Sequence, residues 1–220
     1  SVVGLADTRD STFLSVDDGA VEDMSGNRVV AIGSSTAKQV GVYTKDATSP
    51  VLAGFDLNMN TGVLTLRFSE TVDASTLVGS EITVQNATSA ASSDARFTLT
   101  GGVASAADEP VVTLTLSVTD LNNLKKLRRV AVSDITTFLR LTSAAIKDMD
   151  GNAVVAIADG SALAVGSYVQ DVTAPTLVAF DLDMNLGRLL LVFSETVRSG
   201  SLVTTNLRLQ AASNSPTPGY

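Results

Sequence analysis

Two stretches of the chain carry acidic and amide side chains at alternate positions, as the first part of a calcium loop does. The residues with this spacing are Asp148, Asp150 and Asn152 in one stretch and Asp181, Asp183 and Asn185 in the other. Alternating oxygen ligands with a glycine at the turn suit Ca²⁺, which binds carboxylate and carbonyl oxygens. Neither stretch has the glutamate that closes such a loop further along the chain. Calcium is therefore a candidate cofactor, and no other cofactor is indicated.

Turn formation competes with calcium binding as the explanation of these residues. Related stretches elsewhere in the chain do not keep the ligand charge, because Ser25 replaces Asp150 and Asn58 replaces Asp183. Asp and Asn side chains also accept hydrogen bonds from the backbone two residues further on, which stabilises tight turns. The pattern favours turns, with calcium as the alternative.

A carboxylate at a strand end could act as a general base, and Glu70 and Glu195 each lie near the end of a repeated FSET motif. A base needs a nucleophile, an acid or a metal beside it. The chain has no His and no Cys, which removes imidazole bases, thiol nucleophiles and Ser-His-Asp sites. The sequence therefore predicts no enzyme.

Composition excludes two further classes of function. The net charge is −8 and the isoelectric point is near 4.4, so the chain repels nucleic-acid phosphates and anionic lipids. No apolar run approaches the ~18 residues that a membrane helix needs.

Hydrophobic residues make up 45% of the chain, enough to bury a core. Because it starts at Ser1, without Met or a signal segment, we expect a piece of a longer protein.

One offset of 125 residues relates most of the chain to itself. FDLNMNTGVLTLRFSETV at 55–72 returns as FDLDMNLGRLLLVFSETV at 180–197, and DMSGN at 23–27 returns as DMDGN at 148–152. A period of this length is that of a whole domain rather than of a solenoid unit. We expect the end of one repeat at 1–45, a complete repeat at 46–170 and the start of the next at 171–220.

The complete repeat is predicted to be an all-β domain with one short helix. Runs rich in Val, Leu, Ile, Thr and Phe alternate with turn residues, at 51–57, 63–68, 82–85, 96–100, 111–118, 137–146 and 154–157. Seven such strands suggest an antiparallel two-sheet sandwich. At 120–129, Leu121, Leu124 and Leu127 share one side, with Asp120 at the start and basic residues at the end, which predicts a helix crossing between the sheets.

The joints between repeats carry a D-x-T-x-P sequence, from Asp46 to Pro50 and from Asp171 to Pro175. Proline fixes φ and biases the preceding residue toward extended geometry. We therefore expect residues 168–176 to form a short, stiff connection, since the Gly/Ser-rich composition of a flexible tether is missing.

A small, polar loop after the strand at 82–85 contains a glycosylation sequon at Asn86. Its counterpart near the end of the chain contains Ser215 and Thr217 between prolines, which would suit O-linked sugars. Because a three-residue sequon often arises by chance, an unmodified loop is the alternative.

Together, the motifs TLxLxFSETV, DLNxLK, TxFLxLTSAAIxDMxGNxVVAI and D-x-T-x-P resemble the immunoglobulin-like repeats of very large extracellular proteins. Such repeats occur in bacterial surface proteins and in giant filament proteins of algae and other protists, including mastigoneme-like proteins. The resemblance implies a tandem array of immunoglobulin-like sandwiches at the cell surface, with a structural role and with copies of itself or neighbouring repeats as partners. The rival interpretation is an adhesin whose loops bind a glycan or calcium.

The partial repeats at the two ends cannot each close a sandwich. Residues 171–220 of one copy could be completed by residues 1–45 of another through strand addition. The two pieces together would still lack the counterparts of 96–125. This favours a longer continuous chain over strand addition.

Overall fold

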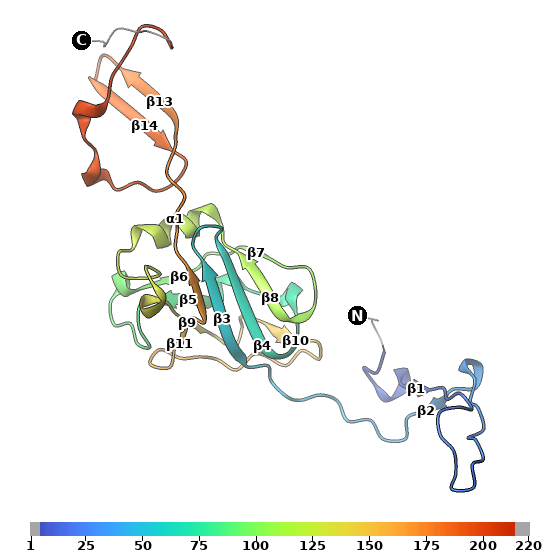
Figure 1. The fold of residues 1–220 in the computed structure, drawn as a ribbon. Helices are drawn as coiled ribbons and strands as arrows, with labels where there is room; N and C mark the ends of the chain where they lie inside the picture. Colours follow the sequence, from blue (N-terminus) through green and yellow to red (C-terminus); the bar gives the residue numbers. More distant parts are fainter. Residues whose placement is uncertain (1–4, 214–220) are drawn as a thin grey trace. The chain divides into compact units, whose positions relative to one another are not determined.

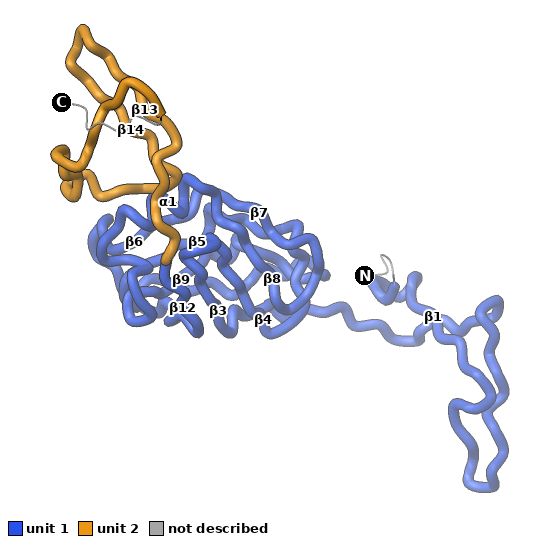
Figure 2. Tube along the Cα trace, turned by 45° about the horizontal axis from the view of Figure 1, so that its top comes forward, with its two compact units in different colours: residues 1–171 blue, residues 172–220 orange. Residues whose placement is uncertain are grey.

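The computed structural model describes residues 5–213 of the chain, and its contacts divide into two compact units, one ending at Asp171 and the other beginning at Val172 (Figure 2). Most regular structure is β-strand, with one α-helix within the described residues (Figure 1). The predictions of a mostly β chain, of antiparallel sheets and of a helix after 111–118 are confirmed. No helix within 5–213 combines the length and apolarity needed to span a bilayer.

The larger sheet of the first unit has six strands in the order β12-β3-β4-β8-β7, with β10 pairing separately to β4. All its pairs are antiparallel except β12 with β3, which is parallel. The strands are β3 (Leu52–Asn58), β4 (Val63–Asp73), β7 (Val103–Ala104), β8 (Glu109–Thr115), β10 (Lys147–Asp148) and β12 (Ser167–Val169).

The smaller sheet of this unit is antiparallel, in the order β11-β9-β5-β6. Its strands are β5 (Ile82–Gln85), β6 (Arg96–Thr98), β9 (Phe138–Leu141) and β11 (Leu163–Ala164). Buried side chains of both sheets form one hydrophobic cluster, in which Leu66 of β4 and Leu139 of β9 are both 0% exposed. The apolar side chains that alternate along the strands of the two sheets therefore pack together in one shared core.

The α-helix α1 (Val118–Lys126) follows β8 of the larger sheet and precedes β9 of the smaller one. It begins where the Ser117 hydroxyl accepts a hydrogen bond from the Asp120 amide at 3.0 Å, a standard N-cap. Leu124 is fully buried, which confirms the apolar side predicted for this helix. The helix starts two residues earlier than predicted, at its cap, and ends at Lys126 rather than Arg129.

The predicted strands at 137–146 and 154–157 differ most from the structure, while those at 96–100 and 111–118 end two and three residues early. The run at 137–146 forms β9 only as far as Leu141, because Thr142 opens a turn in which its hydroxyl accepts from the Ala144 amide and its carbonyl from the Ala145 amide. The run at 154–157 makes no strand, although Ile157 forms an isolated bridge with Leu141. Local turn bonds replace ladder bonds after Leu141, whereas at 154–157 the amides of Val155 and Ile157 donate to two different segments, at Pro50 and Leu141, so no continuous ladder forms.

Short 3₁₀ helices connect many of these strands. They are η1 (Arg9–Ser11), η2 (Ser34–Thr36), η3 (Ala74–Thr76), η4 (Gly79–Glu81), η5 (Ser93–Ala95), η6 (Asp134–Thr136), η7 (Ser199–Ser201) and η8 (Thr204–Asn206).

The N-terminal segment repeats the geometry of residues 130–168 at positions 125 lower. β1 (Phe13–Leu14) pairs with β2 (Lys38–Gln39) as β9 pairs with β11. The Tyr43 hydroxyl donates to the Ala6 carbonyl at 2.6 Å, and the Tyr168 hydroxyl donates to the Ala131 carbonyl at 2.6 Å. Both alanines have a positive φ, 61° and 52°, which non-glycine residues seldom adopt. The sequence repeat is therefore matched by repeated local geometry.

The second unit contains the hairpin β13 (Leu177–Asp183) and β14 (Arg188–Phe193), which pairs as β3 pairs with β4, with a register shift at the corresponding place. Its apolar residues have no core around them. Phe180 is 53% exposed, whereas Phe55, its counterpart in β3, is 0% exposed. No residue from 172 to 213 is buried.

Candidate metal centre

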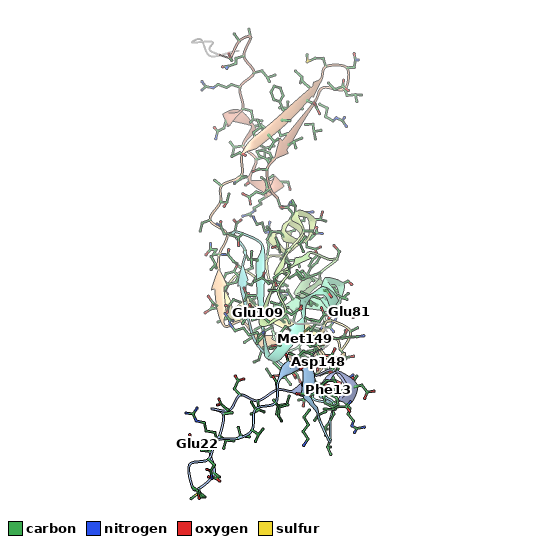
Figure 3. All side chains as sticks on the ribbon, turned by 90° about the vertical axis from the view of Figure 1, so that its right-hand side faces the viewer. Phe13, Glu22, Glu81, Glu109, Asp148 and Met149 are labelled. Atoms are coloured by element: carbon green, nitrogen blue, oxygen red, sulfur yellow. The ribbon has the colours of Figure 1, made fainter. Side chains whose placement is uncertain are left out.

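The DMDGN stretch forms a turn built around Asp148. The Oδ1 atom of Asp148 accepts hydrogen bonds from the amides of Asp150 and Asn152, at 2.9 and 2.7 Å, and Oδ2 accepts from the Asn152 side-chain amide at 2.7 Å. Gly151 has φ of +88°, which a side chain would strain. Asp148 is buried on this turn, beside the half-exposed Met149 (Figure 3).

The same turn is present at 23–27 although the middle acid is missing. Asp23 accepts from the amides of Ser25 and Asn27 and from the Asn27 side chain, at 2.8 to 2.9 Å. These three bonds hold the pKa of Asp23 below its ordinary value, with the Asn27 side chain as the largest cause. The turn thus forms without a carboxylate at the middle position, so Asp150 is not needed to shape it.

The second acidic stretch lies at the end of the β13–β14 hairpin. The Asp183 carboxylate accepts from the amides of Asn185 and Leu186, at 2.9 and 3.0 Å. In the first hairpin, the Asn58 side chain accepts from the amides of Asn60 and Thr61 at 3.0 Å each. Either an amide or a carboxylate oxygen can accept the hydrogen bonds that close this turn. Asp181 lies on the preceding strand, β13. A calcium role for this stretch stays a prediction.

A group of three carboxylates that the sequence did not suggest lies beside the first turn. Asp46, Glu70 and Asp148 each place one carboxylate oxygen within 4.8 Å of those of the other two. Three elements bring them together: the segment before β3 supplies Asp46, β4 supplies Glu70 and β10 supplies Asp148. β10 pairs with β4 through Asp148 and Val72, and the Asn152 side chain donates to the Asp46 carbonyl at 3.3 Å.

The electrostatics of this group centre on Glu70. Its Oε1 atom is buried and has no hydrogen-bond partner within the part of the chain that the structure describes. Burial raises the pKa of Glu70, and the negative charges of Asp46 and Asp148 and a side-chain hydrogen bond with Asp46 raise it further. The pKa of Asp46 is lowered, chiefly because its carboxylate accepts from the Thr48 amide at 2.9 Å. The negative charges of Asp46 and Asp148 therefore lie close to the partly buried carboxyl group of Glu70.

Oxygen ligands of this kind suit a hard divalent cation and no redox metal in particular. Lys45 lies nearby, but its ammonium group donates to the Asp150 carbonyl at 2.8 Å. The signal that could have found the group is the repeat itself. Each of its acids recurs at the 125-residue offset, in the pairs Asp46 and Asp171, Glu70 and Glu195, and Asp23 and Asp148.

The predicted glycosylation site Asn86 directly follows β5 at a half-buried position. Its backbone amide donates to the Ala95 carbonyl at 3.0 Å, and the exposed Thr88 completes the sequon. The buried Gln85 side chain donates to the carbonyls of Ala87 and Thr88, which fixes the backbone of the sequon. Ser215 and Thr217 lie outside the described residues.

The two predicted joints differ in their surroundings. Pro50 is buried, and its carbonyl accepts from the Val155 amide at 2.9 Å, so the first joint is attached to the repeat that follows it. Asp171 forms an ion pair with Lys125 at 3.0 Å, and Pro175 is exposed. Tyr168 and Val169 belong to β12 of the larger sheet, so the predicted connection at 168–176 begins within a strand.

No protein-family model matches the sequence, and no curated protein matches it. Among solved structures, the chain is similar to a crystal structure of the S-layer protein rSbsC(31-844), at 12% identity over 62% of this chain and a TM-score of 0.35. It is also similar to the N-terminal part of the bacterial S-layer protein SbsC, at 13% identity, the same coverage and a TM-score of 0.35. The chain spans 16% and 27% of those two structures. Similarity at this level identifies neither a fold nor a function.

Proposed function

We propose that the chain is part of a non-catalytic structural protein of the cell surface or extracellular space, built from immunoglobulin-like repeats in tandem. The observation that carries the proposal is the recurrence of both sequence and local geometry at an offset of 125 residues. An active site is ordinarily built once in a chain, whereas a scaffold is naturally extended by copying. The copied features here are turns, strand pairs and a tyrosine contact, all of which are structural.

The geometry of the complete repeat at 46–170, called the central repeat from here on, supports a mechanical role. Its two sheets share one core, which is the property of an independently stable module. The D-x-T-x-P joint enters this module through the buried Pro50, and its Asp46 carboxylate is tied to the Thr48 amide. A joint attached in this way limits the angles between modules, so successive repeats would form a stiff rod.

The partners we propose are further repeats and further copies of the protein. The exposed apolar residues of β13 correspond to core residues of β3, so their partner is the back part of a repeat, of the kind that residues 126–170 supply to β3. In that pairing Tyr168 lies opposite Leu57. The corresponding residue opposite Leu182 would be a tyrosine of the same type.

Electron microscopy of the intact protein from its source tests the structural role. We expect regular filaments or a regular surface layer with an axial repeat of one module. Isolated, flexible stalks without lateral order would contradict the proposal and favour an adhesin.

We further propose that Asn86 carries an N-linked glycan in a eukaryotic source. It lies at the end of β5, and its sequon is held in a fixed backbone conformation. Treatment of the native protein with an N-glycosidase should lower the mass of the peptide that contains Asn86 and convert the residue to Asp. An unmodified Asn86 in the native peptide would contradict this proposal and leave the structural role intact.

A further inference from the structure

The N-terminal segment, residues 5–45, has an apolar groove along its pair of strands. Phe13, Leu14, Ile32 and Val40 are among the residues that line the groove. Phe13 is 52% exposed and Leu14 is 65% exposed, and no residue from 5 to 45 is buried. The strands β1 and β2 are therefore formed, but their apolar face is open to water.

In the central repeat, the corresponding strands are covered in two ways. β9 and β11 are the counterparts of β1 and β2 at the 125-residue offset. β5 pairs antiparallel with the other edge of β9, where Val84 lies opposite Leu139. Leu139, the counterpart of Leu14, is 0% exposed in the core that both sheets share. The front part of a repeat therefore supplies both the neighbouring strand and the apolar surface that this strand pair requires.

The C-terminal segment, residues 172–213, corresponds to such a front part and is uncovered as well. Its residues 207–210 occupy the positions of β5, and Leu207 and Leu209 are 40% and 54% exposed. The Gln210 side chain donates to the carbonyl three residues further on at 3.4 Å, as the Gln85 side chain does at 3.1 Å. Within residues 5–213, no strand pairs with residues 207–210. They therefore keep the apolar positions and the local bond of β5 without its neighbouring strands.

A second strand pairing relates the same two segments. In the central repeat, β12 runs parallel to β3, with Tyr168 opposite Leu57. Tyr43 makes the same hydroxyl contact as Tyr168, to an alanine carbonyl at 2.6 Å. Leu182, the counterpart of Leu57, is 45% exposed on β13. Tyr43 and Leu182 therefore present the two sides of a pairing that the central repeat forms internally.

We propose that copies of the chain associate head to tail, with the N-terminal segment of one copy packed on the C-terminal segment of the next. In the expected register, Leu14 lies opposite Leu209 in an antiparallel pair, and Tyr43 lies opposite Leu182 in a parallel pair. Because the two surfaces differ, each pair of copies keeps one free segment of each kind and can be extended. The inference rests on the proposed structural function and names a second copy as the partner of both segments.

This interface should be weaker than the packing inside the central repeat. There, β4 also pairs with β8, and residues 5–45 contain no counterpart of β8. Lys38 stands in the place of Leu163, which packs against the core. We therefore expect reversible association with a dissociation constant of about 1–100 µM.

Analytical ultracentrifugation of the chain 1–220 at about 1–300 µM tests the association. We expect the average mass to rise above the 22.7 kDa of a single chain as the concentration increases. A mass of 22.7 kDa at every concentration would overturn the proposal.

Two variants, each with a matched control, locate the surfaces. Leu14→Asp places a charge in the N-terminal groove and Leu209→Asp places one on the C-terminal segment, so each should weaken self-association by about tenfold or more. Val30→Asp and Val178→Asp add the same charge at positions whose counterparts stay exposed in the central repeat, and should leave association nearly unchanged. Circular dichroism shows whether each variant is folded. Equal effects of variants and controls would overturn the proposal.

Mixing the two variants separates a head-to-tail contact from a contact between like surfaces. Leu14→Asp keeps an intact C-terminal segment and Leu209→Asp keeps an intact N-terminal segment. At concentrations where neither variant associates alone, the mixture should form pairs. A mixture that stays at the mass of a single chain would overturn the proposal.

The test of the interface is independent of the test of the structural role. A chain 1–220 that stays monomeric, together with regular filaments of the native protein, would overturn the interface alone. Flexible, isolated stalks of the native protein, together with a self-associating chain 1–220, would overturn the structural role alone.

Discussion

Two buried polar residues of the central repeat, Asp120 and Thr83, have side-chain hydrogen-bond partners on neighbouring segments. Asp120, 0% exposed, accepts from the Thr100 amide and hydroxyl at 2.8 Å each, which joins the start of α1 to the loop after β6. Thr83 and Thr98, opposite each other on β5 and β6, join their hydroxyls at 2.9 Å. Since an unpaired buried group costs about 1–3 kcal/mol, these contacts specify the arrangement of strands as well as stabilising it.

The ion pair of Asp56 with Arg67 gives a pH-dependent contribution to stability. The Arg67 side chain donates a hydrogen bond to Asp56 and lowers its pKa, with a further contribution from the Ser167 amide. The folded state therefore favours the ionised carboxylate. The stabilisation is fully present above the ordinary pKa of Asp and is lost as the pH falls through the lowered folded value.

Asp56→Asn should therefore lower the free energy of unfolding at neutral pH by no more than about 1 kcal/mol, because the Arg67 side chain is 45% exposed and water screens the pair. The difference from the parent chain should shrink as the pH falls toward about 3. Urea unfolding at several pH values measures it. Glu109→Gln, a change at an exposed acid of β8 in the same sheet, is the control. A loss of stability in Asp56→Asn that does not change with pH would show that the charge of Asp56 is not its cause.

At the scale of elements, close backbone contacts join the two sheets. Gly79 in η4 precedes β5 and lies against the backbone of Gly101, in the connection that leads toward β7 and β8. A Cβ atom at Gly79 would stand 2.7 Å from the Gly101 carbonyl oxygen, a distance that real Cβ contacts do not reach. Gly54 in β3 has nothing within 4 Å of its Cβ position.

Gly79→Ala should destabilise the central repeat by about 1–3 kcal/mol, because the backbone must shift to remove the clash. Gly54→Ala adds the same methyl group in open space, and should change stability by less than about 1 kcal/mol. The midpoints of urea unfolding of the two variants give the comparison. Equal losses of stability in Gly79→Ala and Gly54→Ala would mean that the close contact between Gly79 and Gly101 does not constrain the backbone there.

Strands with several alternating residues were predictable, and two-residue strands were not. Leu64 to Phe68 in β4 shows the period of two that a half-buried strand requires, and the structure follows it. β7, β10 and β11 have two residues each, which is too short for a period, and their pairing depends on distant strands. For the same reason the turn at Asp148 could be predicted, whereas its meeting with Asp46 and Glu70 depends on tertiary pairing of β10 with β4.

At the scale of the whole molecule, burial is confined to the central repeat. Within the described residues, every buried position falls between Pro50 and Ala162. The segments at 5–45 and 172–213 keep the turns and hairpins of a repeat but contribute nothing to a core. A two-stranded hairpin without a packed face is marginally stable, so these segments should open far more readily than the central repeat.

Limited proteolysis of the chain 1–220 with trypsin should therefore leave a resistant fragment that covers most of 46–170. The first cuts are expected at the basic residues of the outer segments, namely Arg9, Arg28, Lys38, Lys45, Arg188, Arg198 and Arg208. Arg67 is also partly exposed, but it lies in β4 between two strands, so cleavage there requires opening of the larger sheet. Mass spectrometry of the early products identifies the cuts. Initial cleavage at Arg67 or Arg96 would mean that the stable unit is not the central repeat.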